Sequence, residues 1–100
     1  MSNFLFHPQA QKELWEAIDW YISVNQKVAR NFEVQINQQL KRIQDTPQHF
    51  PLVFKMIRRA KVNKFPYSIL FETLDENTYI LAVFHESRNP SIWKSRQESK

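Results

Sequence analysis

The sequence predicts an α+β fold of the order β-α-α-β-β-β, in which a helical hairpin packs on one face of a mostly antiparallel sheet. Two observations support this prediction. Apolar residues recur every three or four positions between residues 9 and 44, as in amphipathic helices, whereas the spacing falls to about two after Phe54, as in strands. The 100 residues contain no internal repeat, low-complexity stretch or linker, so we expect residues 1–100 to form one domain.

The N-terminal segment is expected to form a short strand followed by a helix. Residues 3–8, NFLFHP, alternate weakly, and Pro8 blocks the strand but suits the first turn of a helix. Residues 9–24 place an apolar stripe at helical spacing: Ala10, Leu14, Ala17, Ile18 and Tyr21. Trp15 and Trp20 flank this stripe. The acidic residues of the helix are expected on a solvated flank: Glu13, Glu16 and Asp19.

A second helix is expected over about residues 26–44. Its apolar seam is regular, with spacings of three and four residues: Ala29, Phe32, Ile36, Leu40 and Ile43. The Thr-Pro pair at 46–47 ends the helix, because a residue before proline disfavours the helical conformation. The link near Asn25 is short, so we expect the two helices to pack antiparallel. Residues 49–51, HFP, are expected to form a loop.

Three further strands are expected at residues 54–62, 67–74 and 78–84, which are rich in β-branched and aromatic residues. Residues 75–77, Asp-Glu-Asn, supply a hairpin turn without glycine, and residues 63–66 make the earlier bend. The last strand is apolar on both faces, so we expect it to lie centrally in the sheet. The helices cover one face, and we expect the functional residues on the other face or at the end of the sheet.

The absence of cysteine and glycine excludes several kinds of site. Without cysteine there is no disulfide, thiolate metal site or cysteine nucleophile, which fits a reducing cytoplasm. Without glycine, the P-loop and the dinucleotide-binding fingerprint are excluded. The three histidines lack metal-ligand spacing, so we predict neither a metal nor another cofactor. We find no signal-peptide pattern and no membrane-length apolar run, and we expect a cytoplasmic protein that binds no membrane.

The positive charge lies entirely in the second half of the chain. Residues 1–54 hold five basic and five acidic residues, whereas residues 55–100 hold nine and five, which accounts for the net charge of +4. The densest cluster has five cations and no anion: Lys55, Arg58, Arg59, Lys61 and Lys64. Such a cluster attracts phosphates or an acidic protein. Strand alternation places Arg59 and Lys61 on one side, whereas Arg58 shares the parity of the apolar Ala60 and points to the core side or its rim.

Polar and aromatic residues follow the last strand, where AVFHESRNPSIW brings titratable, cationic and aromatic groups together. Metal-free RNA cleavage needs a base, an acid and cations around the phosphate, and His85 or Glu86 could serve as the base. The candidate phosphate ligands are Arg58, Arg59, Lys61, Lys64 and Arg88. Trp93 could stack on a nucleobase. The structural alternatives are a backbone-bonded His85, an Arg88 ion pair with Glu86 or Glu72, and a Trp93 that caps the sheet or the helical hairpin.

The chain resembles the RelE/ParE superfamily of toxins from bacterial type II toxin–antitoxin pairs. The resemblance covers about residues 4–96 and is carried by QKELWEAIDWY, PQHFP, RRAKVNKFPYSILF and AVFHESRNPSIWKSR. Its most specific parts are RRAKVNKFPYSI and the His-x-x-Arg-x-Pro pattern formed by His85, Arg88 and Pro90. The resemblance implies a small basic toxin of a plasmid-stabilisation-like system, which arrests growth until a cognate antitoxin binds it.

Two branches of the superfamily imply different targets. HESRNP looks more like the end of a ParE-type chain, which implies inhibition of DNA gyrase, and we favour this branch. The RelE-like branch, which cleaves messenger RNA on the ribosome, more often carries a C-terminal tyrosine, whereas here Trp93 is the only aromatic residue after Phe84. A non-catalytic nucleic-acid-binding module and a degenerate toxin that keeps only antitoxin binding remain open alternatives.

The antitoxin surface can also be proposed from the residues. An acidic, partly disordered segment would wrap the basic strand and the helical hairpin and fold as it binds. Arg59 and Lys61 would attract it, and Trp15 and Trp20 would anchor it. The alternative for both tryptophans is that they close the core from its edges. The oligomeric state does not follow from the sequence.

Overall fold

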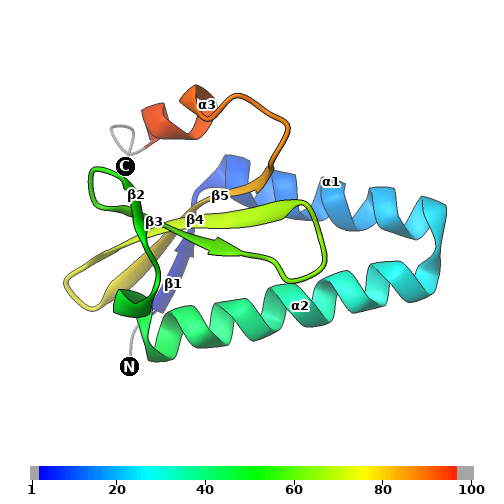
Figure 1. Cartoon of the computed structure of the whole chain (residues 1–100), viewed down its shortest axis with the longest axis horizontal. Helices are drawn as coiled ribbons and strands as arrows, with labels where there is room; N and C mark the ends of the chain where they lie inside the picture. The colour runs from blue at the N-terminus through cyan, green and yellow to red at the C-terminus, as the bar shows by residue number, and fades with distance from the viewer. Residues whose placement is uncertain (1–2, 97–100) are drawn as a thin grey trace.

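The computed structural model describes residues 3–96, and it confirms the α+β fold (Figure 1). The element order is β1 (Asn3–Phe6), α1 (Pro8–Val24), α2 (Gln26–Asp45), the 3-10 helix η1 (Pro47–His49), β2 (Leu52–Phe54), β3 (Ile57–Lys61), β4 (Tyr67–Leu74), β5 (Asn77–His85) and α3 (Ser91–Lys94). Among the helices of the described chain, none combines the length and hydropathy needed to cross a membrane.

The strands form one sheet of the order β1-β5-β4-β3-β2. β1 pairs in parallel with β5, and the other pairs are antiparallel. The predicted inner position of the last strand is confirmed, since β5 lies between β1 and β4. β1 is shorter than β5 and pairs with it only as far as Ile80, so the outer edge of β5 continues beyond its partner.

The helical hairpin forms as the sequence predicts, and Asn25 explains its sharp turn. Asn25 is extended, with φ −168° and ψ 122°, and its backbone N–H donates to the Tyr21 carbonyl at 2.8 Å. Its side-chain oxygen accepts hydrogen bonds from the backbone N–H groups of Lys27 and Val28, at 2.8 and 3.3 Å. One residue therefore ends α1 and caps the start of α2, and the two helices run back along each other.

The main core lies between the hairpin and the sheet. Both predicted apolar seams face it, with Ala10, Ala17, Ala29, Phe32, Ile36 and Ile43 almost fully buried. Tyr21, Phe32 and Phe65 meet with ring centroids 4.9 to 5.2 Å apart, at tilted and edge-on angles that aromatic pairs favour. The helices therefore close one face of the sheet, as predicted.

The opposite face carries a second, smaller core that the sequence analysis did not expect. Its buried members are Ile57, Leu70, Leu81, Ala82, Phe84 and Trp93. α3 lies over this face, on the other side of the sheet from α2 (Figure 1). Trp93 is only 6% exposed, so of the two alternatives considered for it the structure shows the one in which it caps the sheet. The reason is that β4 and β5 are apolar on both faces, so the second face also needs a cover.

The region before β3 also differs from the prediction. Residues 54–62 were expected to form one strand, but the chain reverses at Lys55 and Met56, and Phe54 belongs to β2. Residues 49–51 were expected to form a loop, but η1 includes His49. Lys55 takes a left-handed conformation with φ 50°. Lysine is an uncommon residue in this conformation, so no composition signal marks this turn.

Candidate functional site

Alternation along β3 separates its cations onto the two faces of the sheet. Arg59 pairs with Leu70 and Lys61 with Ser68, and directly paired residues project to the same face, which here is the α3 face. Arg58 is half-buried on the helix side, and its Nη1 donates to the Phe50 carbonyl oxygen at 2.5 Å. The parity prediction is therefore confirmed for Arg59 and Lys61, and Arg58 lies at the rim of the main core.

A pocket of about 120 Å³ lies on the α3 face, where β3, β4 and β5 meet the segment that follows β5. Its lining residues are Arg59, Ser68, Leu70, Phe84, Glu86, Arg88, Pro90 and Trp93. The structure therefore brings together four of the residues proposed from the sequence for one site: Arg59, Glu86, Arg88 and Trp93. We call this pocket the arginine pocket. Trp93 contributes a buried wall to it and leaves no ring face exposed for stacking on a nucleobase.

Lys61 and Glu86 form an ion pair beside the arginine pocket. The Lys61 Nζ lies 2.8 Å from Glu86 Oε1 and 3.2 Å from the Phe65 carbonyl oxygen. The hydrogen bond from Lys61 lowers the pKa of Glu86, and the charges of Lys61, Arg59 and His85 lower it further. Glu86 is therefore ionised at neutral pH, and a carboxylate stabilised in this way is a weak general base.

His85 lies in a different pocket from Arg59, and of the arginines of the arginine pocket only Arg88 lines both pockets. The His85 ring meets Tyr67 edge-on at 5.1 Å, and its Nδ1 accepts a hydrogen bond from the Ser87 backbone N–H at 3.0 Å. It lines a different pocket, of about 240 Å³, together with Glu13, Glu16, Ala17, Trp20, Tyr67, Val83 and Arg88. Lys64 is exposed in the turn before β4, with φ 71°, and lines neither pocket. Of the two predicted bases, His85 therefore shares a pocket with Arg88 but not with Arg59, Lys61 or Lys64, whereas Glu86 lines the arginine pocket and is paired with Lys61.

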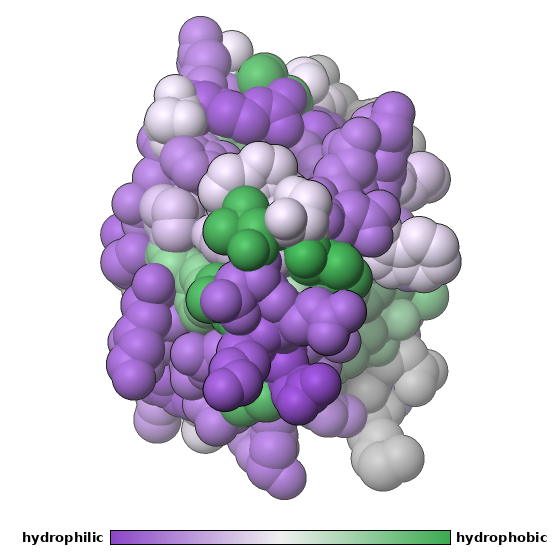
Figure 2. All heavy atoms as spheres, turned by 90° about the vertical axis from the view of Figure 1, so that its right-hand side faces the viewer, coloured by the Kyte–Doolittle hydropathy of each residue, from purple (hydrophilic) through white to green (hydrophobic). Residues whose placement is uncertain are grey.

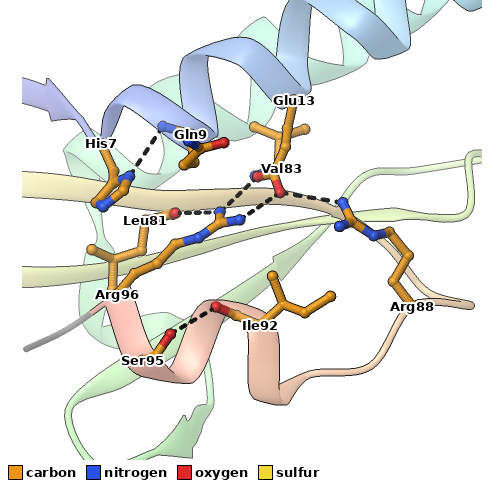
Figure 3. A network of polar contacts seen from close by, with 9 residues as sticks. All are labelled: His7, Gln9, Glu13, Leu81, Val83, Arg88, Ile92, Ser95 and Arg96. Atoms are coloured by element: carbon orange, nitrogen blue, oxygen red, sulfur yellow. Dashed lines mark hydrogen bonds and ion pairs between the residues drawn. The ribbon is translucent and has the colours of Figure 1, made fainter. Parts of the chain in front are cut away.

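Glu13 is a key polar residue that the sequence analysis placed wrongly. It was expected on a solvated flank, but it is 9% exposed and forms two hydrogen bonds with Arg96, at 2.8 and 2.9 Å (Figure 3). Glu13 also lies three residues after Ala10 and four before Ala17, which are both on the buried stripe. This spacing was the available signal that Glu13 faces inward.

The Glu13–Arg96 pair forms hydrogen bonds with the backbone of β5 on its outer edge, beyond the end of β1. Glu13 Oε1 accepts a hydrogen bond from the Val83 backbone N–H at 3.2 Å, and Arg96 Nη1 donates to the Leu81 carbonyl oxygen at 3.0 Å. The two side chains thus satisfy backbone groups that a longer β1 would have paired. Because Arg96 follows α3, the same pair fixes the C-terminal segment against α1 (Figure 3).

Arg88 lies between this edge and the arginine pocket. Its Nη1 is 3.4 Å from Glu13 Oε2, its guanidinium lies 5.0 Å from the centre of the Phe84 ring, and its side chain is 46% exposed. The ion pairs considered for it in the sequence, with Glu86 or Glu72, are replaced by this longer contact with Glu13. Since Arg96 already binds both Glu13 oxygens, Arg88 remains available to a further anion.

Trp15 and Trp20 are both exposed on α1, at 61% and 59%. The alternative that they close the core is therefore wrong. Trp20 borders the pocket that holds His85. The end of the molecule where α1 meets α2 shows apolar side chains in the middle of a mostly hydrophilic surface (Figure 2), and the exposed apolar residues there include Ile22, Val24 and Val28.

The fold and the site together define a small RelE/ParE-type toxin domain, with a helical hairpin on one face of the sheet and a cationic pocket on the other. The model of the ParE toxin of type II toxin-antitoxin system, parDE, matches residues 4–90, and the chain belongs to this family. It is thus a ParDE-type toxin, and the family implies a cognate antitoxin.

Individual relatives agree with this assignment. The chain is 30% identical over 86 residues to toxin ParE2 of Mycobacterium tuberculosis, in strains CDC 1551 and H37Rv, covering 85% of this chain and 82% of the relative. Its fold is similar to that of a chain of the chromosomal ParDE TA system from P. aeruginosa, with a TM-score of 0.72 and 20% identity, over 85% of this chain and 95% of that chain.

Proposed function

We propose that this toxin arrests growth by inhibiting DNA gyrase in the cytoplasm, and that the arginine pocket belongs to its target-binding surface. One observation carries the proposal beyond the family assignment. Arg59 and Arg88 gather on the α3 face at a pocket of about 120 Å³, whereas the candidate base His85 lies in a different pocket, to which only Arg88 also belongs. This arrangement suits the binding of a macromolecule through charge and shape.

The geometry gives no comparable support to the alternative function, cleavage of messenger RNA. A general base must lie within hydrogen-bond reach of the hydroxyl that it deprotonates, while cations hold the neighbouring phosphate. His85 and Arg59 line different pockets, and the Glu86 carboxylate in the arginine pocket is already bound by the Lys61 ammonium at 2.8 Å. The nearby groups therefore favour an inhibitor over a nuclease.

We further propose that the cognate antitoxin neutralises the toxin by covering both α1 and the α3 face. Trp15 and Trp20 are exposed aromatic residues, of the type that anchors interfaces, and Arg59 and Lys61 supply the attraction for an acidic segment. A segment that folds on binding can reach both surfaces because it gains contacts along its whole length.

Induction in bacterial cells, with and without the cognate antitoxin, tests the proposal first. Growth arrest that the antitoxin relieves is the expected result, and normal growth in both cultures would contradict it. The purified toxin should then inhibit supercoiling by gyrase in a reconstituted assay. Mapping of messenger RNA ends separates the alternative, because ribosome-positioned cleavage that disappears in His85→Ala would establish a nuclease and overturn gyrase inhibition as the mechanism.

A further inference from the structure

The arginine pocket contains a buried hydroxyl group without a hydrogen-bond partner. Ser68, on β4, is 4% exposed and lines the pocket, and within residues 3–96 its Oγ has no partner. A buried hydroxyl that forms no hydrogen bond destabilises the fold, because it has lost its hydrogen bonds to water. A ligand atom that accepts a hydrogen bond in this pocket would remove that cost.

The charges around Ser68 indicate that the missing acceptor is anionic. Two carboxylates near the pocket already have a close cation, since Glu13 binds Arg96 and Glu86 binds Lys61. Among the residues that the structure describes, the Arg59 guanidinium forms neither a hydrogen bond nor an ion pair, and Arg88 has only its 3.4 Å contact with Glu13. Thus Arg59, which has no ion pair, and Arg88, which has only a long one, lie in the same pocket as the unpaired hydroxyl, beside a Glu86 carboxylate that is bound to Lys61.

The size and lining of the pocket limit the ligand to one side-chain group. Its volume is about 120 Å³, whereas pockets for whole small molecules are usually about 300–1,000 Å³. Apart from Ser68 and the charged residues, the lining is apolar: Leu70, Phe84, Pro90 and Trp93. Such a lining suits the methylene groups of an aspartate or glutamate side chain, while arginine forks match its carboxylate.

We propose that the arginine pocket binds the carboxylate of one acidic side chain from a polypeptide, and that the cognate antitoxin supplies it. Arg59 and Arg88 would hold the carboxylate oxygens, and the Ser68 hydroxyl would donate a hydrogen bond to one of them. The inference rests on the proposed function in one respect, namely that an acidic antitoxin covers this face. A nucleic-acid backbone fits less well, because a pocket of about 120 Å³ takes one side-chain group and its apolar lining offers no partner to the neighbouring phosphates of a strand.

Titration of the isotope-labelled full chain, followed by NMR, tests the chemistry directly. The probes are the blocked tripeptide Ac-Ala-Glu-Ala-NH2, its neutral glutamine counterpart, and dimethyl phosphate as a phosphodiester of equal charge. We expect saturable shifts at the Trp93 indole and the Ser68 amide with the glutamate peptide alone. An equal response to the glutamine peptide, no response, or tighter binding of dimethyl phosphate would overturn the proposal.

Single substitutions assign the response to the proposed groups. Arg59→Gln and Arg88→Gln should each weaken binding of the glutamate peptide by about tenfold or more, the usual effect of losing a hydrogen bond to a charged group. Arg30→Gln, at an exposed position on α2, is the matched control and should leave binding unchanged. Unchanged affinity in both pocket variants would refute the assignment.

Ser68→Ala distinguishes a binding residue from a structural one. If the hydroxyl serves the ligand, the alanine variant should bind the peptide more weakly and yet melt at a higher temperature than the parent chain. A lower melting temperature would show that Ser68 supports the fold and would contradict its proposed role. Peptide binding that is unaffected by the substitution would contradict it as well.

The complex with the antitoxin separates this inference from the proposed function. Arg59→Glu and Arg88→Glu should each reduce antitoxin affinity by about tenfold or more, whereas Arg30→Glu should not. If antitoxin binding and growth arrest persist unchanged in both pocket variants, the carboxylate proposal fails and the toxin function stands. If the parent chain neither binds the antitoxin nor arrests growth, the proposed function itself fails.

Discussion

The β5 edge and the arginine pocket are two polar clusters of opposite character. At the edge, the Glu13 carboxylate receives hydrogen bonds from Arg96 and from the Val83 backbone, and Arg96 also binds a backbone carbonyl. In the pocket, Arg59 forms no ion pair within residues 3–96 and the Ser68 Oγ has no partner there. The first cluster is complete within the chain, so it stabilises the fold. The second is incomplete, so it is the one suited to a partner.

Arg88 connects the two clusters and shows how they differ. It contacts Glu13 at 3.4 Å, longer than the 2.8 and 2.9 Å contacts of Arg96, and 46% of its side chain is exposed. An exposed ion pair of this kind contributes little to stability. We therefore expect substitutions at the edge to affect folding, and substitutions at the pocket to affect binding.

The largest effect on stability should come from breaking the ion pair between Glu13 and Arg96 at the β5 edge. Glu13→Gln removes the carboxylate charge that the buried Arg96 guanidinium binds, and the loss of one member of a buried ion pair typically lowers the free energy of unfolding by about 3–5 kcal/mol. Urea denaturation measures this loss. The control is Glu16→Gln on the exposed side of α1, which should change stability by about 0.5 kcal/mol or less. Equal losses of stability in the two variants would contradict the conclusion that the β5 edge stabilises the fold.

The next effect concerns binding through α1. Trp15→Ala and Trp20→Ala should leave the free energy of unfolding nearly unchanged, because both side chains are mostly exposed. If they anchor the antitoxin, each should weaken its binding by about 2 kcal/mol or more, as interface hot spots do. Isothermal titration calorimetry with the cognate antitoxin measures the affinity. Affinity that is unchanged in both variants would remove α1 from the proposed interface.

A smaller effect on stability, of opposite sign to that of Glu13→Gln, is expected from Ser68 in the arginine pocket. Ser68→Ala removes a buried hydroxyl without a hydrogen-bond partner and should raise the free energy of unfolding by about 1 kcal/mol. Ser23→Ala is the matched control, since the Ser23 hydroxyl donates to the Trp20 carbonyl oxygen at 2.6 Å on an exposed helix surface. That substitution should cost a few tenths of a kcal/mol, so thermal unfolding should separate the two serines by sign.

Local patterns predicted most of the fold. The helix bounds follow from apolar spacing and from Asn25, because a capping residue acts on its immediate neighbours. The hairpin at Lys55 and the short helix α3 were missed, since lysine seldom marks a turn and four residues are too few to show a helical period. Tertiary packing determined both features.

The site could be predicted only where it depends on strand parity. Alternation placed Arg59 and Lys61 on one face, and the structure confirms it. The pairing of Glu13 with Arg96 joins residues 83 positions apart in the sequence, and no local pattern contains that information. The separation of His85 from Arg59 likewise depends on the register between β3, β4 and β5, which alternation within one strand does not fix.

The smallest expected effect is a pH dependence of the folding stability, which comes from Glu86 at the rim of the arginine pocket. The hydrogen bond from Lys61 lowers the pKa of Glu86 below its ordinary value of 4.5. A carboxyl group with a lower pKa in the folded state stabilises the fold above pH 4.5 and loses that contribution as the pH falls through the folded-state value. Both side chains are largely exposed, so the contribution should be small and should weaken with salt. Glu86→Gln should therefore flatten the stability curve only on the acidic side, while its stability at pH 7 stays close to that of the parent chain. A large loss of stability at pH 7 would show that Glu86 stabilises the fold as the Glu13–Arg96 pair does. Glu86 would then belong with the residues that support folding and not with those that bind a partner.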